Sequence, residues 1–389
     1  MQKVKVVFFV DMLINDYDGA SNTMFQLINR IPSEHFEFLF VYGMGPDCIA
    51  GFKCIRVCSL SVPKNKNYRF ATTMFQKVAL EKEIIVFDPD IIHIASPSLL
   101  GSYALKTANR MKIPVISIFH TNFISYVDYY LKHLPFLIDY IKNKVRNFLQ
   151  SFYNRCDTVY VPSHTMIREL TAVGVKPEVI KLWERGIDTT VFSPSKRNRD
   201  YMRALTGNDN PCILFSSRLV WEKNLQTMIV LYQLAEKHQL NYNFIVAGDG
   251  VAAKALKKAM PNAVFLGYLV HEKLSVVYAS SDVFFFPSVT ETFGNVVLEA
   301  MACGLPCVIA DSGGSQDFIQ HGINGFKCNP YDAGDFLNRL SEIIEQPELA
   351  KRFSCNGMEV SKKYNWEKLA SQYFEELMSL ACKSSAFKR

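Results

Sequence analysis

The sequence lacks an apolar run long enough to cross a lipid bilayer. A spanning helix needs about 18 consecutive apolar residues, and charged or strongly polar side chains interrupt every stretch of the chain before that length. The first segment, from Lys3 to Asp11, has a short apolar core between charged positions, which is typical of a buried β-strand rather than of a secretory signal peptide. We therefore expect a cytoplasmic protein.

The cysteine spacing of a zinc site or of a disulfide framework is also missing. The ten cysteines are scattered along the chain. Cys54 and Cys58 are four residues apart, as are Cys303 and Cys307, and neither pair has the two-residue spacing or the histidine partners of a zinc site. We expect reduced thiols and no bound metal ion.

Strong charge of one sign is absent as well. The formal net charge is +6, and most of this excess lies in residues 1–190. It falls well short of the dense Lys and Arg stripe of nucleic-acid-binding proteins, so we expect no nucleic-acid partner. A small basic excess in one half of the chain fits an acidic acceptor or an anionic membrane surface.

The glycine-rich turn of a dinucleotide-binding enzyme does not follow the first predicted strand. In NAD-binding Rossmann folds the pattern G-x-G-x-x-G stands at that point. Here Val10 is followed by D-M-L-I-N-D-Y-D-G over residues 11–19. Nothing in this segment supports a nicotinamide cofactor.

What the chain does contain is a regular alternation of short apolar strands and helix-length amphipathic segments. This alternation predicts an α/β fold with parallel sheets and crossover helices. It pauses at residues 191–211, where turn residues and charges predict a linker. We expect two Rossmann-like domains, residues 1–190 and 212–365, facing across a cleft, with a helix over residues 366–389 returning toward the first. In such folds ligands bind at the carboxyl ends of the strands.

Residues 284–306 predict a strand, a polar turn and a helix in succession. The helix opens near Gly294, and a helix N-terminus offers unpaired N–H groups and partial positive charge to a phosphate. Glu291 lies in the turn and Glu299 about one and a half turns into the helix, so the two carboxylates would reach different parts of one extended ligand. The alternative is an ordinary helix on which Glu299 is merely solvated.

Two cations follow the first predicted strand of the second domain. Arg218 and Lys223 stand five residues apart after a strand over residues 212–216, where both would face the cleft. Arg binds a phosphate as a bidentate fork and Lys as a compact charge. This pair predicts a site for a diphosphate, and the alternative is an ion pair of Arg218 with Glu222 at a helix start.

These segments resemble glycosyltransferase family 4, whose members have the GT-B fold and retain the anomeric configuration of the sugar. In that family two glutamates separated by seven residues precede an A-x-A/S-G-x-P turn, as Glu291 and Glu299 precede Gly304 and Pro306 here. The resemblance is strong over residues 180–330. The pattern is most similar to members that mannosylate or glucosylate lipid and polyprenyl-linked acceptors.

The resemblance implies transfer of a hexose from GDP-mannose or a UDP-hexose to an acceptor hydroxyl, on a lipid-linked or cell-surface glycan, without cofactor or metal. It also implies roles for individual residues. The implied residues are His120, Arg218, Lys223 and Glu291 for catalysis, Gly19, Tyr268, Leu269, Phe293, Gly294, Asn295 and Glu299 for donor binding, and Asn122 and Tyr126 on the acceptor side.

The sequence departs from the family pattern at two places. Gly19 stands alone in the first loop, where the family usually has a Gly-Gly pair. After Gly313 and Gly314 many members place a Glu three residues on, whereas this chain has Ser315-Gln316-Asp317. Both departures concern contacts to the donor sugar.

Other functions remain open from the residues alone. Asp88-Pro89-Asp90 has the Asp-x-Asp letters of the metal-dependent glycosyltransferase architecture, although Pro89 and the strand that follows favour a strand-entry turn. The two-domain scaffold also suits a nucleotide-sugar epimerase, a phosphorylase with a Lys-bound pyridoxal phosphate, or a non-catalytic nucleotide-sugar-binding protein. The presence of both phosphate-binding cations argues against the last of these.

Residues 129–149 predict an amphipathic helix. Apolar residues recur there at helical spacing, and Lys142, Lys144 and Arg146 add positive charge. Such a helix can lie on the inner face of an anionic membrane, with residues 64–69 as a second contact. Alternatively, the apolar stripe packs on the sheet of the first domain.

Overall fold

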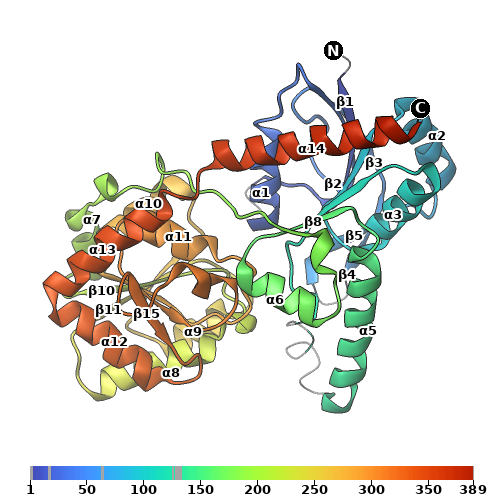
Figure 1. The fold of residues 1–389 in the computed structure, drawn as a ribbon. Helices are drawn as coiled ribbons and strands as arrows, with labels where there is room; N and C mark the ends of the chain where they lie inside the picture. Colours follow the sequence, from blue (N-terminus) through green and yellow to red (C-terminus); the bar gives the residue numbers. More distant parts are fainter. Residues whose placement is uncertain (1–2, 16–18, 63–64, 125–126, 128–133, 389) are drawn as a thin grey trace. The chain divides into compact units, whose positions relative to one another are not determined.

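The computed structural model describes residues 3–15, 19–62, 65–124, 127 and 134–388. The described residues form two compact units. Unit 1 lies within Met1–Ile124, Phe136–Glu184 and Trp366–Arg389, and unit 2 within Ser125–Pro135 and Arg185–Asn365. Each unit is built on a parallel sheet flanked by helices (Figure 1). The predicted α/β class with two Rossmann-like sheets is therefore confirmed.

The main sheet of unit 1 joins seven described strands in the order β3-β2-β1-β6-β7-β8-β9, and every neighbouring pair is parallel. The strands are β1 (Val4–Met12), β2 (Phe36–Met44), β3 (Lys53–Arg56), β6 (Ile91–Ile94), β7 (Val115–Ile118), β8 (Thr158–Val161) and β9 (Ile180–Leu182). A separate antiparallel hairpin consists of β4 (Cys58–Val62) and β5 (Asn65–Thr72).

Both faces of this sheet are covered, because successive side chains of a strand point to opposite sides. Val6 and Phe8 of β1 pack with α1 (Gly19–Ile28) and α14 (Trp366–Lys388). Val7 and Phe9 pack toward the opposite face. The helices that supply that second core are α2 (Lys77–Phe87), α3 (Leu99–Met111), α5 (Pro135–Tyr153) and α6 (His164–Ala172).

A buried hydrogen bond attaches α14 to the sheet of unit 1. The Tyr373 hydroxyl lies 2.6 Å from Nδ1 of His93, whose ring stacks on Phe8 with centroids 4.0 Å apart. Nε1 of Trp183 donates to the carbonyl of Leu369 at 3.0 Å. Burial lowers the pKa of His93 to about 3, so its imidazole is neutral at ordinary pH.

The sheet of unit 2 joins six described strands in the order β12-β11-β10-β13-β14-β15, again all parallel. The strands are β10 (Cys212–Ser216), β11 (Asn243–Ala247), β12 (Val264–Gly267), β13 (Val283–Phe286), β14 (Cys307–Ala310) and β15 (Gly325–Cys328). The helices are α7 (Arg199–Thr206), α8 (Leu225–Lys237), α9 (Ala253–Ala259), α10 (His271–Ser280), α11 (Asn295–Ala302), α12 (Ala333–Glu345) and α13 (Pro347–Ser361).

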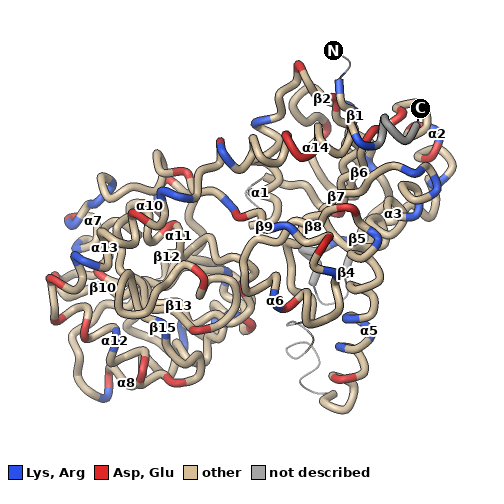
Figure 2. Tube along the Cα trace, in the orientation of Figure 1, with Lys and Arg blue, Asp and Glu red and all other residues tan. Residues whose placement is uncertain are grey.

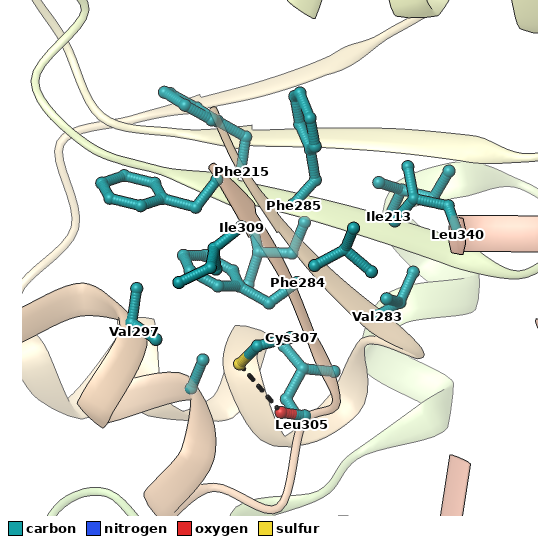
Figure 3. Close-up of a cluster of buried hydrophobic side chains, with 14 of the residues drawn as sticks. Ile213, Phe215, Val283, Phe284, Phe285, Val297, Leu305, Cys307, Ile309 and Leu340 are labelled. Atoms are coloured by element: carbon teal, nitrogen blue, oxygen red, sulfur yellow. Dashed lines mark hydrogen bonds between the residues drawn. The ribbon is translucent and has the colours of Figure 1, made fainter. Parts of the chain in front are cut away.

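Strand β13 shows why the central strands read as unbroken apolar runs. A parallel strand covered on both faces has no solvent side, so all four of its residues are buried. Phe284 packs against Tyr278 of α10 with ring centroids 5.5 Å apart, and Phe285 packs against Phe336 of α12 at 5.0 Å. Figure 3 shows Phe284 and Phe285 on opposite sides of the strand within this core.

Residues 191–211, which we expected as a linker, are ordered on unit 2. They contain the short 3-10 helix η2 (Pro194–Lys196) and helix α7, and they bury Phe192 and Met202 in the core. Their charged side chains are exposed, and Arg203 of α7 pairs with Asp209 after the helix. Among the described residues, no helix is both long and apolar enough to cross a membrane.

Candidate active site

Arg218, Lys223 and Glu291 lie in two neighbouring loops of unit 2. Strand β10 ends at Ser216 and leads to Arg218 and the 3-10 helix η3 (Trp221–Lys223), while β13 ends at Phe286 and leads to the turn that carries Glu291. These strands are paired in parallel, so their carboxyl ends lie at the same edge of the sheet. The two segments singled out from the sequence therefore meet in one place.

A buried ion pair joins the two loops. Nζ of Lys223 lies 2.5 Å from Oε1 of Glu291, and the two side chains are only 7% and 17% exposed. The hydroxyl of Ser288 donates to the same oxygen at 3.0 Å. Burial alone would raise the pKa of Glu291, but the charge and hydrogen bond of Lys223, with Ser288 and Arg218, outweigh it and lower that pKa. Glu291 is thus held as a carboxylate.

Asn224 positions Lys223, and sequence reasoning did not find it. Its backbone adopts the left-handed conformation with φ of 55°, which Asn tolerates better than most residues. Its Nδ2 donates to the carbonyl of Pro287 at 3.1 Å and to that of Pro330 at 2.6 Å. Asn224 therefore ties the end of η3 to the ends of β13 and β15.

Gly294 allows a close approach between the β13 turn and the segment after β14. Its φ is 96°, and a Cβ atom at this position would lie 2.5 Å from Cβ of Ser315. The N–H of Gly314 donates to the carbonyl of Glu291 at 2.6 Å. Only glycine fits here without a shift, and α11 begins at the next residue, Asn295. This helix N-terminus lies directly beside the turn that carries Glu291.

The side chain of Phe293 belongs to the core of unit 2. It is 1% exposed, and its ring packs edge-on against Phe318 at 4.8 Å and near Tyr364 at 5.9 Å. The guanidinium of Arg185 lies over the same ring. Phe293 thus fills the core, and a contact to a donor would have to come from its backbone.

Glu299 is buried rather than solvated. It is 8% exposed, and its Oε2 accepts a hydrogen bond from the Tyr278 hydroxyl at 3.2 Å. Burial raises the pKa of this carboxyl, while the nearby His271 and the Tyr278 hydrogen bond oppose the rise. The alternative of an ordinary solvated helix residue is therefore wrong for Glu299.

Tyr268 and Leu269 follow β12 at the same edge of the sheet. Tyr268 is exposed, and Leu269 packs partly against the core of unit 2. The preceding Gly267 accepts a hydrogen bond from the N–H of Gly248 at 2.7 Å. This bond joins the loops that follow β11 and β12. The loop that carries Arg218 is joined to the end of β11, because the N–H of Ser217 donates to the carbonyl of Ala247.

Unit 1 has its own candidate pocket, at the carboxyl ends of β1, β6 and β7. A cavity of about 60 Å³ is bounded by Asp11, Ser96 and His120, together with apolar side chains of these segments. Asp11 was not predicted, although its position at the end of an apolar strand is a usable signal. Its Oδ1 accepts from the N–H of Ala71 at 2.8 Å and its Oδ2 from the Ser96 hydroxyl at 2.7 Å, and burial raises its pKa.

The other unit 1 predictions fall in different places. Nδ2 of Asn122 donates to Oε2 of Glu169 at 2.6 Å, so Asn122 is tied to α6. Gly19 is the exposed first residue of α1. Tyr126 lies outside the described residues. The Asp88-Pro89-Asp90 segment has a structural role, because Asp88 ends α2 and Oδ2 of Asp90 accepts from the N–H of Lys5 at 2.9 Å.

Two protein-family models match this chain over most of its length. The model described as Glycosyltransferase Family 4 matches residues 17–191, and the model described as Glycosyl transferases group 1 matches residues 198–360. The chain belongs to glycosyltransferase family 4. As a member of this family it is a hexosyltransferase that takes its sugar from a nucleotide sugar.

Similar proteins agree with this assignment. A GDP-mannose-dependent alpha-mannosyltransferase of Corynebacterium glutamicum is 27% identical, over 96% of this chain and 89% of the relative. An alpha-monoglucosyldiacylglycerol synthase of Streptococcus pneumoniae is 26% identical, over 78% of this chain and 70% of the relative. A solved sucrose-phosphate synthase of Thermosynechococcus elongatus shares the GT-B fold, with a TM-score of 0.79 at 19% identity, covering 98% of this chain and 100% of that one.

Proposed function

We propose that this glycosyltransferase moves a hexose from GDP-mannose or a UDP-hexose to a hydroxyl of a lipid-linked or cell-surface glycan acceptor, with retention of the anomeric configuration. The contact between Lys223 and Glu291 carries the proposal. Glu291 stands four residues before Asn295, the first residue of α11. At this edge of the sheet a cation, a carboxylate and a helix N-terminus lie together. The cation and the helix N-terminus suit the negatively charged diphosphate of a donor, and the carboxylate suits its neutral hydroxyls. The name of the first sequence relative supports GDP-mannose as a donor, and the name of the second supports a lipid as the acceptor class.

Each group would act on a different part of the donor. Arg218, Lys223 and the first amides of α11 would stabilise the charge on the departing diphosphate, which is the main electrostatic demand of the reaction. Glu291, released from Lys223 by the phosphate, would accept hydrogen bonds from sugar hydroxyls. Glu299 would hold the ribose.

Further roles follow from the family pattern. His120, at the end of β7 in unit 1, would contact the transferring sugar, and Asn122 and Tyr126 would lie on the acceptor side. Gly19, Tyr268 and the other donor-binding residues keep their predicted roles in this proposal. Two fixed cations and helix amides replace a divalent metal in it, so a chelator should leave the rate unchanged.

The decisive experiment is a donor and acceptor screen. Purified protein is incubated with GDP-mannose, UDP-glucose or UDP-galactose, with and without a glycosyldiacylglycerol or a polyprenyl-linked oligosaccharide, and released nucleoside diphosphate is measured. Release that depends on acceptor, with an α-linked product by NMR, supports the proposal. Conversion of the donor without acceptor would instead indicate an epimerase, and an inverted product would contradict retention.

We also propose that helix α5 brings the enzyme to an anionic membrane surface. Its C-terminal part packs on unit 1 through Leu149, whereas Phe136 and Tyr140 are 76% and 58% exposed. Nζ of Lys144 lies 5.5 Å from the ring centroid of Tyr140, so charge and apolar surface occur together. Figure 2 shows Lys and Arg along this helix. The second predicted membrane contact is residues 64–69, of which Lys64 lies outside the described residues.

Sedimentation with liposomes tests this surface. We expect binding to vesicles of phosphatidylglycerol and phosphatidylcholine at low salt, weakened by added salt because exposed charges are screened. Lys142→Glu with Lys144→Glu should abolish it. Lys254→Glu with Lys258→Glu, on α9 of unit 2, makes the same charge change elsewhere and should bind as the wild type does. Unchanged binding of the α5 variant would remove the membrane proposal.

A further inference from the structure

A buried line of three side chains connects the end of strand β10 with helix α11 in unit 2. The Tyr278 hydroxyl donates to Oε2 of Glu299 at 3.2 Å, and the side chain of Ser216, the last residue of β10, lies close enough to that hydroxyl to oppose the rise of its pKa. Ser216, Tyr278 and Glu299 are 4%, 0% and 8% exposed, respectively. The line runs from the strand that leads to Arg218, through α10, into the middle of α11.

The ring of Tyr278 has little freedom to leave this position. It lies 5.5 Å from the ring of Phe284 in β13 and 6.1 Å from that of Phe192, measured between centroids. Packing on two sides restricts the ring, so its hydroxyl is presented at one point. A hydroxyl fixed in this way selects one orientation of the carboxylate that it touches.

We propose that Tyr278 is a positioning residue that holds Glu299 for the ribose hydroxyls of the donor, with Ser216 orienting the Tyr278 hydroxyl. The inference rests on the proposed role of Glu299. Tyr278 occupies a lone pair of Oε2 and leaves Oε1 and the remaining lone pairs for a ligand, because an ionised carboxylate can accept several hydrogen bonds. Tyr278 itself does not touch the donor.

The hydrogen bond also affects the charge of Glu299. Burial disfavours the ionised form, and the groups that face this carboxyl are Tyr278 and His271 on α10 and Cys303 directly after α11. Of these, Tyr278 is the one that donates a hydrogen bond to it. Without that donor the carboxylate is both less well oriented and harder to ionise.

Tyr278→Phe tests the inference with almost no change in volume. We expect the donor KM to rise about tenfold, the effect of one hydrogen bond to a charged group, while kcat stays close to that of the wild type. A purely structural defect would lower kcat as well. Tyr242→Phe is the matched control, because its hydroxyl bonds to Ser341 at 3.1 Å elsewhere in unit 2.

Ribose recognition gives the sharper readout. Binding of GDP, UDP and their 2′-deoxy analogues is measured by calorimetry for the wild type, Tyr278→Phe, Glu299→Gln and Tyr242→Phe. Wild type and Tyr242→Phe should prefer the ribonucleotides, and this preference should fall in Glu299→Gln and, by about the same factor, in Tyr278→Phe.

The possible failures are distinguishable. Full ribose preference in Tyr278→Phe together with its loss in Glu299→Gln would overturn the positioning role alone. Full preference in Glu299→Gln would overturn the ribose role of Glu299 and this inference with it. No binding of GDP or UDP to the wild type would overturn the proposed function itself.

Discussion

Lys223 and Glu291 each carry a charge inside unit 2, and their contact offsets much of the cost of removing both from water. Such pairs contribute little net stability against apolar residues of similar volume, but the loss of one partner leaves the other charge buried alone. The same two residues are therefore sensitive sites for folding and for catalysis.

The effect of removing one partner of this ion pair can be compared with the effect of removing both. Lys223→Met should lower the free energy of unfolding by about 3 kcal/mol and reduce turnover by about 100-fold or more. The double variant Lys223→Met with Glu291→Gln should regain stability in urea unfolding but not turnover. Lys273→Met, which removes an exposed lysine of α10, should change neither quantity. Recovered turnover in the double variant would contradict the role of Lys223 at the diphosphate.

Sequence patterns located the charged residues of the unit 2 site but not the residues that hold them. Arg218, Lys223 and Glu291 stand in recognisable spacing after apolar strands. Tyr278 reaches Glu299 across 21 residues, and Asn224 reaches Pro330 across 106. Contacts of this kind depend on how the strands are ordered in the sheet, and no local spacing encodes that order.

At the scale of elements, the alternation of strands and helices was predictable because buried parallel strands need continuous apolar runs. Helix α7 was not predicted from the sequence. Within it only Met202 is fully buried, and its charged residues give the segment the composition of a linker. Of the predicted helix over residues 129–149, residues 129–133 lie outside the described residues, and α5 has features of both alternatives. Leu149 packs on the core, while Phe136 and Tyr140 remain exposed.

Gly294 lies where the turn after β13 packs closely against the residues after β14. Gly294→Ala must accommodate a Cβ atom 2.5 Å from Ser315 at a positive φ, so it should destabilise the protein by about 2 kcal/mol or more. Gly207→Ala is the matched control, because that glycine has a φ of 74° and an added Cβ atom would meet no other atom within 4 Å. It should cost about 1 kcal/mol. Equal costs would show that close packing at Gly294 is unimportant.

Helix α14 should make unit 1 sensitive to acid through His93. Its folded pKa of about 3 lies below the ordinary value of 6.5, so the neutral form is favoured by folding. The associated stability is complete above about pH 6.5 and is lost as pH falls toward 3, at no more than about 1.4 kcal/mol per pH unit. In urea unfolding between pH 7 and 4, His93→Gln should show a shallower pH dependence than the wild type. The exposed His164→Gln should retain the wild-type slope.

For the whole molecule, donor binding should stabilise one unit more than the other. A nucleotide that binds only the folded protein adds about 2.7 kcal/mol at 100 times its Kd. In hydrogen exchange with GDP or UDP, we expect added protection in the loops after β10 and β13 and in α11, and little in the strands of unit 1. Protection confined to unit 1 would contradict the placement of the nucleotide.

The Lys223–Glu291 contact also acts as a filter on what can enter the site. An incoming group must replace a carboxylate as the partner of Lys223, and only another anion can do so without stranding the ammonium in a buried position. Neutral compounds such as free mannose, glucose or a nucleoside offer no such replacement. They should compete poorly with the donor even at high concentration, whereas pyrophosphate and nucleoside diphosphates should be effective inhibitors.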